Sequence, residues 1–188
     1  MAKAYVLIVN ESGTDDSVIS NLRNIPSVTS AYGTYGSFDL LTTLESNNEE
    51  EIQNDICFKI RQISKIRSTV TLLVDKKQGI SKINTIEQNV LDTHMDFAYM
   101  IIRCLQSDKS IIIKKLDKIA EVIEADILIG NYEIICKIAS PTYKEISKII
   151  SKKIRKINEI KSTITIFLTR KQEFTKNQMP RHEYLTTS

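Results

Sequence analysis

The side chains that usually carry out catalysis are scarce in this chain of 188 residues. It has two histidines, His94 and His182, and neither belongs to a recognisable motif. Its three cysteines, Cys57, Cys104 and Cys136, form no CxxC pair, and free cysteines of this kind usually pack in the interior. No glycine-rich phosphate loop or nucleophile motif is present. We therefore expect no enzyme, no metal site and no cofactor.

A more suggestive combination of residue types occurs twice. The chain reads "YGSFDLL" from Tyr35 to Leu41 and "IGNYEII" from Ile129 to Ile135. Each phrase has a glycine, a small polar residue, an aromatic residue, an acid and two aliphatic residues. Taken alone, Gly-Ser and Gly-Asn favour a two-residue hairpin of type II′, and the aromatic residue favours packing. The rim of a pocket is the alternative interpretation.

The phrase recurs because the chain contains an internal duplication. A shift of 94 residues aligns Ala4–Asp75 with Ala98–Thr169 without a gap, and 21 of the 72 pairs are identical. We call these segments the first copy and the second copy. The spacing exceeds that of solenoid repeats, so each copy is expected to form a small domain.

Hydrophobic periodicity predicts the same six elements in each copy. Short apolar or β-branched runs predict four strands, and apolar residues at helical spacing predict two helices, in the order βαββαβ. We therefore predict an α+β fold with two ferredoxin-like repeats whose antiparallel sheets pack face to face, as in a dimeric α/β barrel. The expected divisions are residues 1–75 for the first domain, 76–96 for a partly helical linker, 97–170 for the second domain and 171–188 for a polar tail.

Composition indicates a globular protein in the cytoplasm. The chain is 41% hydrophobic and 26% charged. No apolar run approaches the roughly 20 residues of a membrane-spanning helix. The segment "MAKAYVLIVN" has no signal-peptide cleavage site, and unpaired cysteines suit a reducing compartment.

Charge is divided unequally between the copies. Residues 1–75 hold 6 basic and 10 acidic side chains, whereas residues 97–170 hold 14 basic and 8 acidic ones. A solvated helix face is the favoured interpretation of the basic cluster, and a phosphate or an acidic surface is the alternative. Opposite charges on equivalent helices would also favour contacts between chains. The basic cluster comprises Lys144, Lys148, Lys152, Lys153, Arg155, Lys156 and Lys161, and its acidic counterpart Glu49, Glu50, Glu51 and Asp55.

The repeated phrases resemble a signature of the Lrp/AsnC family. "GSFDLL" and "GNYEII" are similar to the G-D-Y-D-L-hydrophobic motif of that family's effector domain. The last strands, "IRSTVTLLV" and "IKSTITIFL", resemble its V-x-S/T-T-x-T pattern. The likeness covers both copies. It departs from the pattern at Ser37 and Asn131, where the family has Asp, and at Glu133, also Asp in the family, so the two sites are expected to differ.

The resemblance implies a sensor of an amino acid or a similar small metabolite. Asp39 would bind an α-ammonium group, and backbone amides near Gly36 would hold a carboxylate. Domains of this family pair sheet against sheet and associate further, with the effector bound between dimers. The residues implied are Gly36, Ser37, Phe38, Asp39, Ser68, Thr69 and Thr71 in the first copy, and Gly130, Asn131, Tyr132, Glu133, Ser162, Thr163 and Thr165 in the second.

Family members begin with a helix-turn-helix domain of roughly 50–60 residues. Here the first strand begins at about Ala4, so we expect a stand-alone effector module that does not bind DNA or membranes directly. It would regulate transcription through homo-oligomers or through association with DNA-binding relatives. The alternative is a structural protein that assembles without an effector. A small cofactor-dependent enzyme is the third and least favoured class.

Overall fold

The computed structural model describes residues 1–82 and 94–176 of the chain. Within these residues the predicted order βαββαβ occurs twice. The first copy contains β1 (Ala2–Asn10), α1 (Asp15–Arg23), β2 (Val28–Tyr35), β3 (Leu40–Ser46), α2 (Glu49–Phe58) and β4 (Ile66–Ser81). The second contains β5 (Asp96–Arg103), α4 (Lys109–Asp117), β6 (Val122–Ile129), β7 (Ile134–Ser140), α5 (Tyr143–Lys152) and β8 (Ser162–Thr175).

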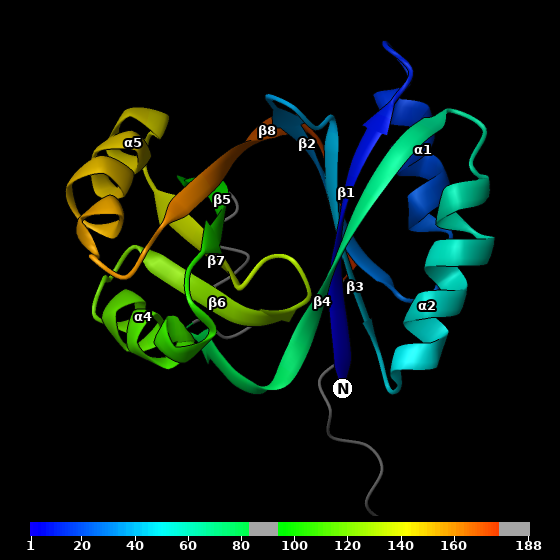
Figure 1. Ribbon diagram of the computed structural model, residues 1–188. Helices are drawn as coiled ribbons and strands as arrows, with labels where there is room; N and C mark the ends of the chain where they lie inside the picture. The colour runs from blue at the N-terminus through cyan, green and yellow to red at the C-terminus, as the bar shows by residue number, and fades with distance from the viewer. Residues whose placement is uncertain (83–93, 177–188) are drawn as a thin grey trace, which may run out of the picture.

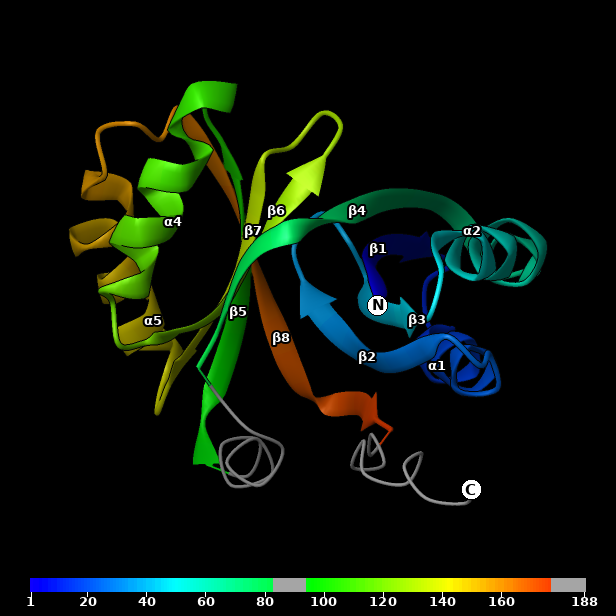
Figure 2. The ribbon, with the colours of Figure 1, turned by 90° about the horizontal axis from the view of Figure 1, so that it is seen from below.

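All eight strands join into one closed antiparallel barrel. Their order is β1-β3-β2-β8-β5-β7-β6-β4. Helices α1 and α2 cover one side of the barrel, and α4 and α5 cover the opposite side (Figure 1). Seen from below, the strands of both copies lie between the two helix layers (Figure 2). The predicted fold is thus confirmed.

The last strand of each copy closes the barrel by pairing with the other copy. In β4, Gly79 lies opposite Asp126 of β6, and in β8, Thr175 lies opposite Ser30 of β2. These strands continue past residues 75 and 170, where the copies were expected to end. The reason is long-range pairing, because the extensions satisfy backbone groups of the other copy's second strand. Residues 83–93 of the predicted linker and 177–188 of the predicted tail lie outside the described residues.

Buried side chains form three cores. One lies between α1, α2 and the first copy's strands, and an equivalent one lies under α4 and α5. The third fills the barrel and includes Tyr5, Tyr32, Phe97 and Tyr99. The strand exchange extends to the outer cores, since Phe174 of β8 packs in the first copy's helix core. Ile80 of β4 packs against the second copy's helix core.

The helical spacing of Ile52, Ile56, Ile60 and Ile63, repeated in the second copy, predicts a second helix longer than the one observed. The observed helix ends at Phe58 or Lys152 and is followed by a 3₁₀ turn, residues 60–62 or 154–156. Side-chain caps begin both helices, because Asn48 and Thr142 accept hydrogen bonds from backbone amides in the first turn. The tighter final turn keeps Ile60 and Ile154 fully buried while the chain turns toward the last strand.

Candidate functional site

The two repeated phrases lie at the same end of the barrel. Each follows the second strand of its copy, and both second strands run in the same direction because alternate strands of an antiparallel barrel are parallel. We call this the hairpin end. The ends of β1 and β5 and the beginnings of β4 and β8 lie there too. The topology thereby collects most of the predicted site residues at one end of the molecule.

In the first copy, the phrase and the last strand flank the end of β1. The Asp39 amide donates to the Ile8 carbonyl at 2.9 Å, and Ile8 lies opposite Thr69. Ser68 lies opposite Val9, one residue further along β1. The two segments that the resemblance joined in one site are therefore neighbours in space.

The second copy repeats this arrangement with longer bonds. The Glu133 amide donates to the Ile102 carbonyl at 3.3 Å, and Ile102 lies opposite Thr163. Ser162 lies opposite Arg103 in the same ladder. Glu133 and Ser162 thus occupy the places of Asp39 and Ser68.

The two acidic side chains bind backbone amides of their own copy. Asp39 Oδ2 accepts from the Asn10 amide at 2.9 Å, and Glu133 Oε2 accepts from the Cys104 amide at 3.3 Å. Both carboxylates are half-buried, and the second oxygen of each makes no hydrogen bond among the described residues. Each acid therefore has a structural role at a strand end and retains an oxygen for a ligand donor.

The loop of each hairpin is longer than the predicted two-residue turn. The first hairpin is closed by the Thr34 amide, which donates to the Asp39 carbonyl at 2.8 Å, and residues 36–39 lie between β2 and β3. The four-residue loop arises because the Asp39 amide bonds to β1, so β3 begins only at Leu40. Gly36 and Gly130 have φ of 120° and 118°, a conformation that favours glycine. Ser37 and Asn131 are exposed at the tips.

The remaining predicted residues face in different directions. Phe38 and Tyr132 are half-buried and pack against the core inside the barrel. Thr71 and Thr165 have buried hydroxyl groups without hydrogen-bond partners in the described structure. In β4 the flanking residues Val70 and Leu72 contact the barrel core, so strand alternation places Thr71 on the helix side. These threonines are separated from the exposed tips.

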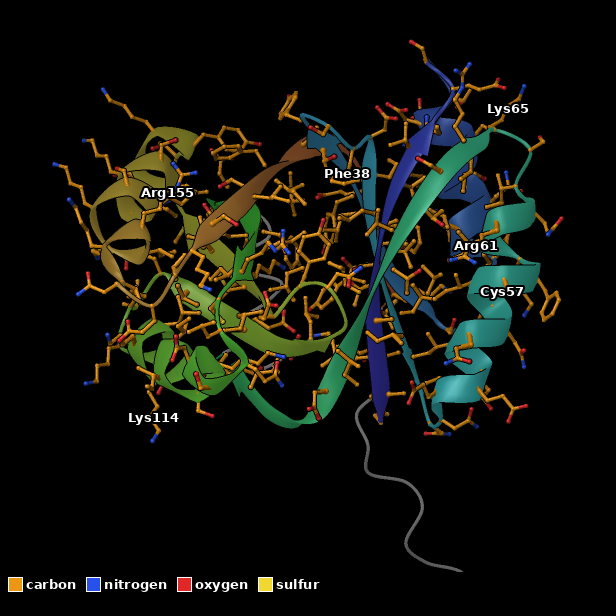
Figure 3. All side chains as sticks on the ribbon, viewed as in Figure 1. Phe38, Cys57, Arg61, Lys65, Lys114 and Arg155 are labelled. Carbon is orange, nitrogen blue, oxygen red and sulfur yellow. The ribbon has the colours of Figure 1, made fainter. Side chains whose placement is uncertain are left out.

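Sequence reasoning missed an arginine beside each cluster. Arg61 Nε donates to Thr69 Oγ1 at 3.2 Å, and Arg155 Nε donates to Thr163 Oγ1 at 3.1 Å. The two arginines lie on opposite outer sides of the molecule, with Phe38 between the helix layers (Figure 3). The available signal was the repeat itself, because both Arg–Thr pairs are preserved at a spacing of 94 residues.

Two exposed apolar side chains lie at the hairpin end. Tyr35 and Ile129 occupy equivalent positions just before the glycines, with 63% and 55% of their surfaces exposed. Three cavities formed by described residues lie elsewhere and are lined by none of the predicted site residues.

A separate group of charged residues lies at the opposite end of the barrel interior. Lys3 pairs with Glu124 and with Asp126, the latter at 2.9 Å, and the Tyr5 hydroxyl donates to Asp126 at 2.6 Å. Burial alone would lower the pKa of Lys3, but the two carboxylates raise it above its usual value. Burial would raise the pKa of Glu124, whereas Lys3 and Lys137 keep it below its usual value. This network links β1 to β6 across the copies.

Lys137 is buried within the same interior among aromatic rings. Its ammonium lies 4.5 Å from the centroid of Phe97, 5.6 Å from that of Tyr32 and 5.8 Å from that of Tyr99. Rings stabilise a desolvated cation through their negative faces. Lys137 replaces Thr43 of the first copy, so the charged interior is not symmetric.

Cysteine and histidine positions give no sign of metal binding in the part of the chain that is described. No group of three or more His, Cys, Asp or Glu residues there is placed to hold a metal ion. All three cysteines are free; Cys104 and Cys136 are buried as expected, but Cys57 is exposed. His94 is exposed, and His182 lies outside the described residues. No helix of residues 1–82 and 94–176 is long and apolar enough to cross a membrane.

Comparison with known sequences confirms the resemblance. Residues 98–176 match the family model of the Lrp/AsnC ligand binding domain. Regulatory protein AsnC of Haemophilus influenzae is 32% identical over 110 residues, which are 57% of this chain and 63% of AsnC. HTH-type transcriptional regulator FL11 of Pyrococcus horikoshii is 30% identical over 73 residues, 39% of this chain and 48% of FL11. The chain spans less than two thirds of the length of either relative.

The second copy therefore matches the model of the Lrp/AsnC ligand binding domain, and the duplication extends the same fold to the first copy. Among solved structures, the siroheme decarboxylase NirDL has a TM-score of 0.69 over 94% of this chain and 73% of its own, at 12% identity. At this identity the likeness concerns the fold alone. The relatives matched by sequence are named as regulators.

Proposed function

We propose that this chain is a non-enzymatic sensor in transcription regulation that binds an amino acid or a similar metabolite at the hairpin end. The main support is the paired arrangement of Asp39 and Glu133 beside Ser68 and Ser162, in a chain whose second copy matches a ligand-binding domain. An ammonium group would pair with the unused carboxylate oxygen. A carboxylate would accept from exposed loop amides and serine hydroxyl groups.

The proposed sensor acts by association with itself or with DNA-binding relatives. The exposed side chains of Tyr35 and Ile129 support this step, since exposed apolar side chains beside the proposed ligand site suit burial by a second molecule. A ligand held between two molecules would bind the assembled state more tightly than the separate molecules, and it would therefore favour assembly.

The experiment is a thermal-shift screen with the twenty amino acids, followed by light scattering to measure assembly size with any hit. A ligand that binds only the folded state raises the melting midpoint. Asp39→Asn and Glu133→Gln remove the charge but keep an oxygen for the backbone amide, so they should abolish the shift without unfolding the chain. Asp16→Asn, an exposed acid on α1, is the matched control.

A second candidate is an assembly protein without an effector. The unequal charge of the two copies supports it. Assembly size that falls with added salt, together with no response to amino acids, their derivatives or nucleotides, would favour this role over the sensor.

A further inference from the structure

The two copies carry equivalent grooves of opposite character beside their second helices. The first-copy groove, beside α2, is lined by Pro26, Ser27, Glu45, Ser46, Glu51, Asn54, Asp55 and Lys59. The second-copy groove, beside α5, is lined by the eight residues 94 positions later and by Met95, Ile123, Pro141 and Lys152. Their volumes are about 360 Å³ and about 620 Å³. The duplication therefore allows a direct comparison of one groove in two versions.

The first-copy groove is occupied by its own polar network. Asp55 is buried and accepts from the Ser27 hydroxyl at 2.6 Å and from the Ser27 amide at 3.2 Å. Lys59 pairs with the same carboxylate at 2.6 Å. The lining of this groove includes Lys59 and the three carboxylates of Glu45, Glu51 and Asp55. The buried carboxylate of Asp55 already has hydrogen-bond and ion-pair partners within the chain. Nothing in this version favours an anion.

The second-copy groove has lost that network. Ile149 stands in place of Asp55, and Glu121 in place of Ser27. Lys153, the equivalent of Lys59, pairs instead with Glu121 at 2.7 Å, at the side of the groove. The floor is apolar, since Ile149, Ile123 and Ala139 are each only 6–8% exposed and Met95 is half-buried beside them.

Two lysines at the rim remain without ion-pair partners among the described residues. Lys148 and Lys152 are separated by four positions on α5, so their side chains project from the same face of the helix. The other rim acid, Glu145, accepts from Ser140 Oγ at 3.2 Å. The equivalents of Lys148 and Lys152 in the first copy are Asn54 and Phe58, so both positive charges belong to the second groove alone.

We propose that the second-copy groove binds a small monocarboxylate with an apolar chain, of the medium-chain fatty-acid type. The chain would lie on Ile149, Ile123 and Ala139, and the carboxylate would pair with Lys148 and Lys152. The volume falls within the range of small-molecule sites. Ala139 lies at the end of β7 remote from the hairpin, so this site is separate from the proposed effector site.

The experiment is calorimetric titration of the full chain with octanoate, compared with acetate, octan-1-ol and octylammonium. Octanoate should bind saturably with one site per chain, while acetate lacks the chain and octylammonium carries the wrong charge. The double variant Lys148→Glu/Lys152→Glu should weaken octanoate binding by about ten-fold or more. The control variant Lys144→Glu/Lys156→Glu changes the net charge equally, at exposed positions outside the groove. Its affinity for octanoate should stay within about two-fold of that of the unmodified chain.

The proposal fails if the two double variants weaken binding equally, if octan-1-ol or octylammonium binds as well as octanoate, or if octanoate does not bind. The pair Lys148→Gln/Lys152→Gln gives the same test should charge reversal prevent folding. An acidic amphipathic peptide that binds this groove while octanoate does not would also overturn it. None of these outcomes depends on the amino-acid response at the hairpin end, so the two proposals can fail separately.

Discussion

Tyr5 and Tyr99 occupy equivalent positions in the two copies, and their rings meet edge to face inside the barrel with centroids 5.7 Å apart. This contact follows the approximate symmetry of the duplication, but the two hydroxyl groups have different surroundings. The Tyr5 hydroxyl donates to Asp126 at 2.6 Å, whereas the residue equivalent to Asp126 in the first copy is Tyr32. A symmetric aromatic pair therefore lies beside an asymmetric charged network.

Tyr5→Phe should lower the free energy of unfolding by about 1–2 kcal/mol, because Asp126 loses a buried donor while the ring contact remains. Urea denaturation followed by circular dichroism measures this change. Tyr35→Phe removes a hydroxyl from a side chain that is 63% exposed and should be nearly neutral. Equal effects of the two substitutions would show that the hydrogen bond contributes little.

The strand and helix order could be predicted from sequence, whereas the links between the copies could not. Alternating apolar residues and isoleucines at helical spacing report local burial, which defines each βαββαβ unit. The pairing of Lys3 with Glu124 joins residues 121 positions apart, and no local pattern indicates it. The extensions of β4 and β8 are polar, so periodicity missed them, although "KKQGIS" and "RKQEFT" also align at the 94-residue shift.

The candidate site was predictable only in part, for a related reason. The resemblance placed Asp39 near Ser68, and the strand register brings them together around β1. The resemblance gave no information about which side of its strand Thr71 faces. In the structure, the alternation of side chains along β4 places the Thr71 hydroxyl on the helix side of the sheet. The two grooves also required the structure, since their lining residues come from three separate segments of the first copy and four of the second.

Lys3→Met should lower the free energy of unfolding at pH 7 by about 2–3 kcal/mol, because two partly buried carboxylates lose their cation. Lys65→Met is the control, since the Lys65–Glu11 pair is exposed and should contribute less than about 1 kcal/mol. Urea denaturation of both variants at pH 7 measures the difference. A loss for Lys3→Met no larger than that of the control would contradict a structural role for the network.

The same network predicts a specific pH dependence. The folded-state pKa of Glu124 lies below its unfolded value, so its contribution is complete above the unfolded pKa of about 4.3 and is lost as the pH falls through the folded pKa. Wild-type stability should therefore fall more steeply below about pH 4 than that of Lys3→Met. Parallel pH profiles of the two proteins would count against this assignment.

Gly36→Ala and Gly130→Ala should each destabilise the fold by about 1–3 kcal/mol. Both glycines have a φ near 120°, and an added Cβ would meet no atom within 4 Å, so the cost is backbone strain alone. Ser37→Ala at the exposed loop tip is the control. If the alanine variants melt at the wild-type temperature, the loops must accommodate a different backbone conformation.

Phe174→Ala tests whether the strand exchange contributes to stability. Phe174 is 8% exposed, and its ring packs in the first copy's core under the Arg23 guanidinium, 5.1 Å from the ring centroid. Removal of this ring should lower the free energy of unfolding by about 3–4 kcal/mol. Ile80→Ala, at the equivalent but only partly buried position, should lower it by about half as much. Phe58→Ala, at a residue 73% exposed, should be nearly neutral. Urea denaturation of the three variants gives the order.

Because Phe174 belongs to the second copy's last strand, a large loss on its truncation means that the first copy depends on the second for its core. A neutral result for Phe174→Ala would instead mean that this side chain contributes little to the first copy's core.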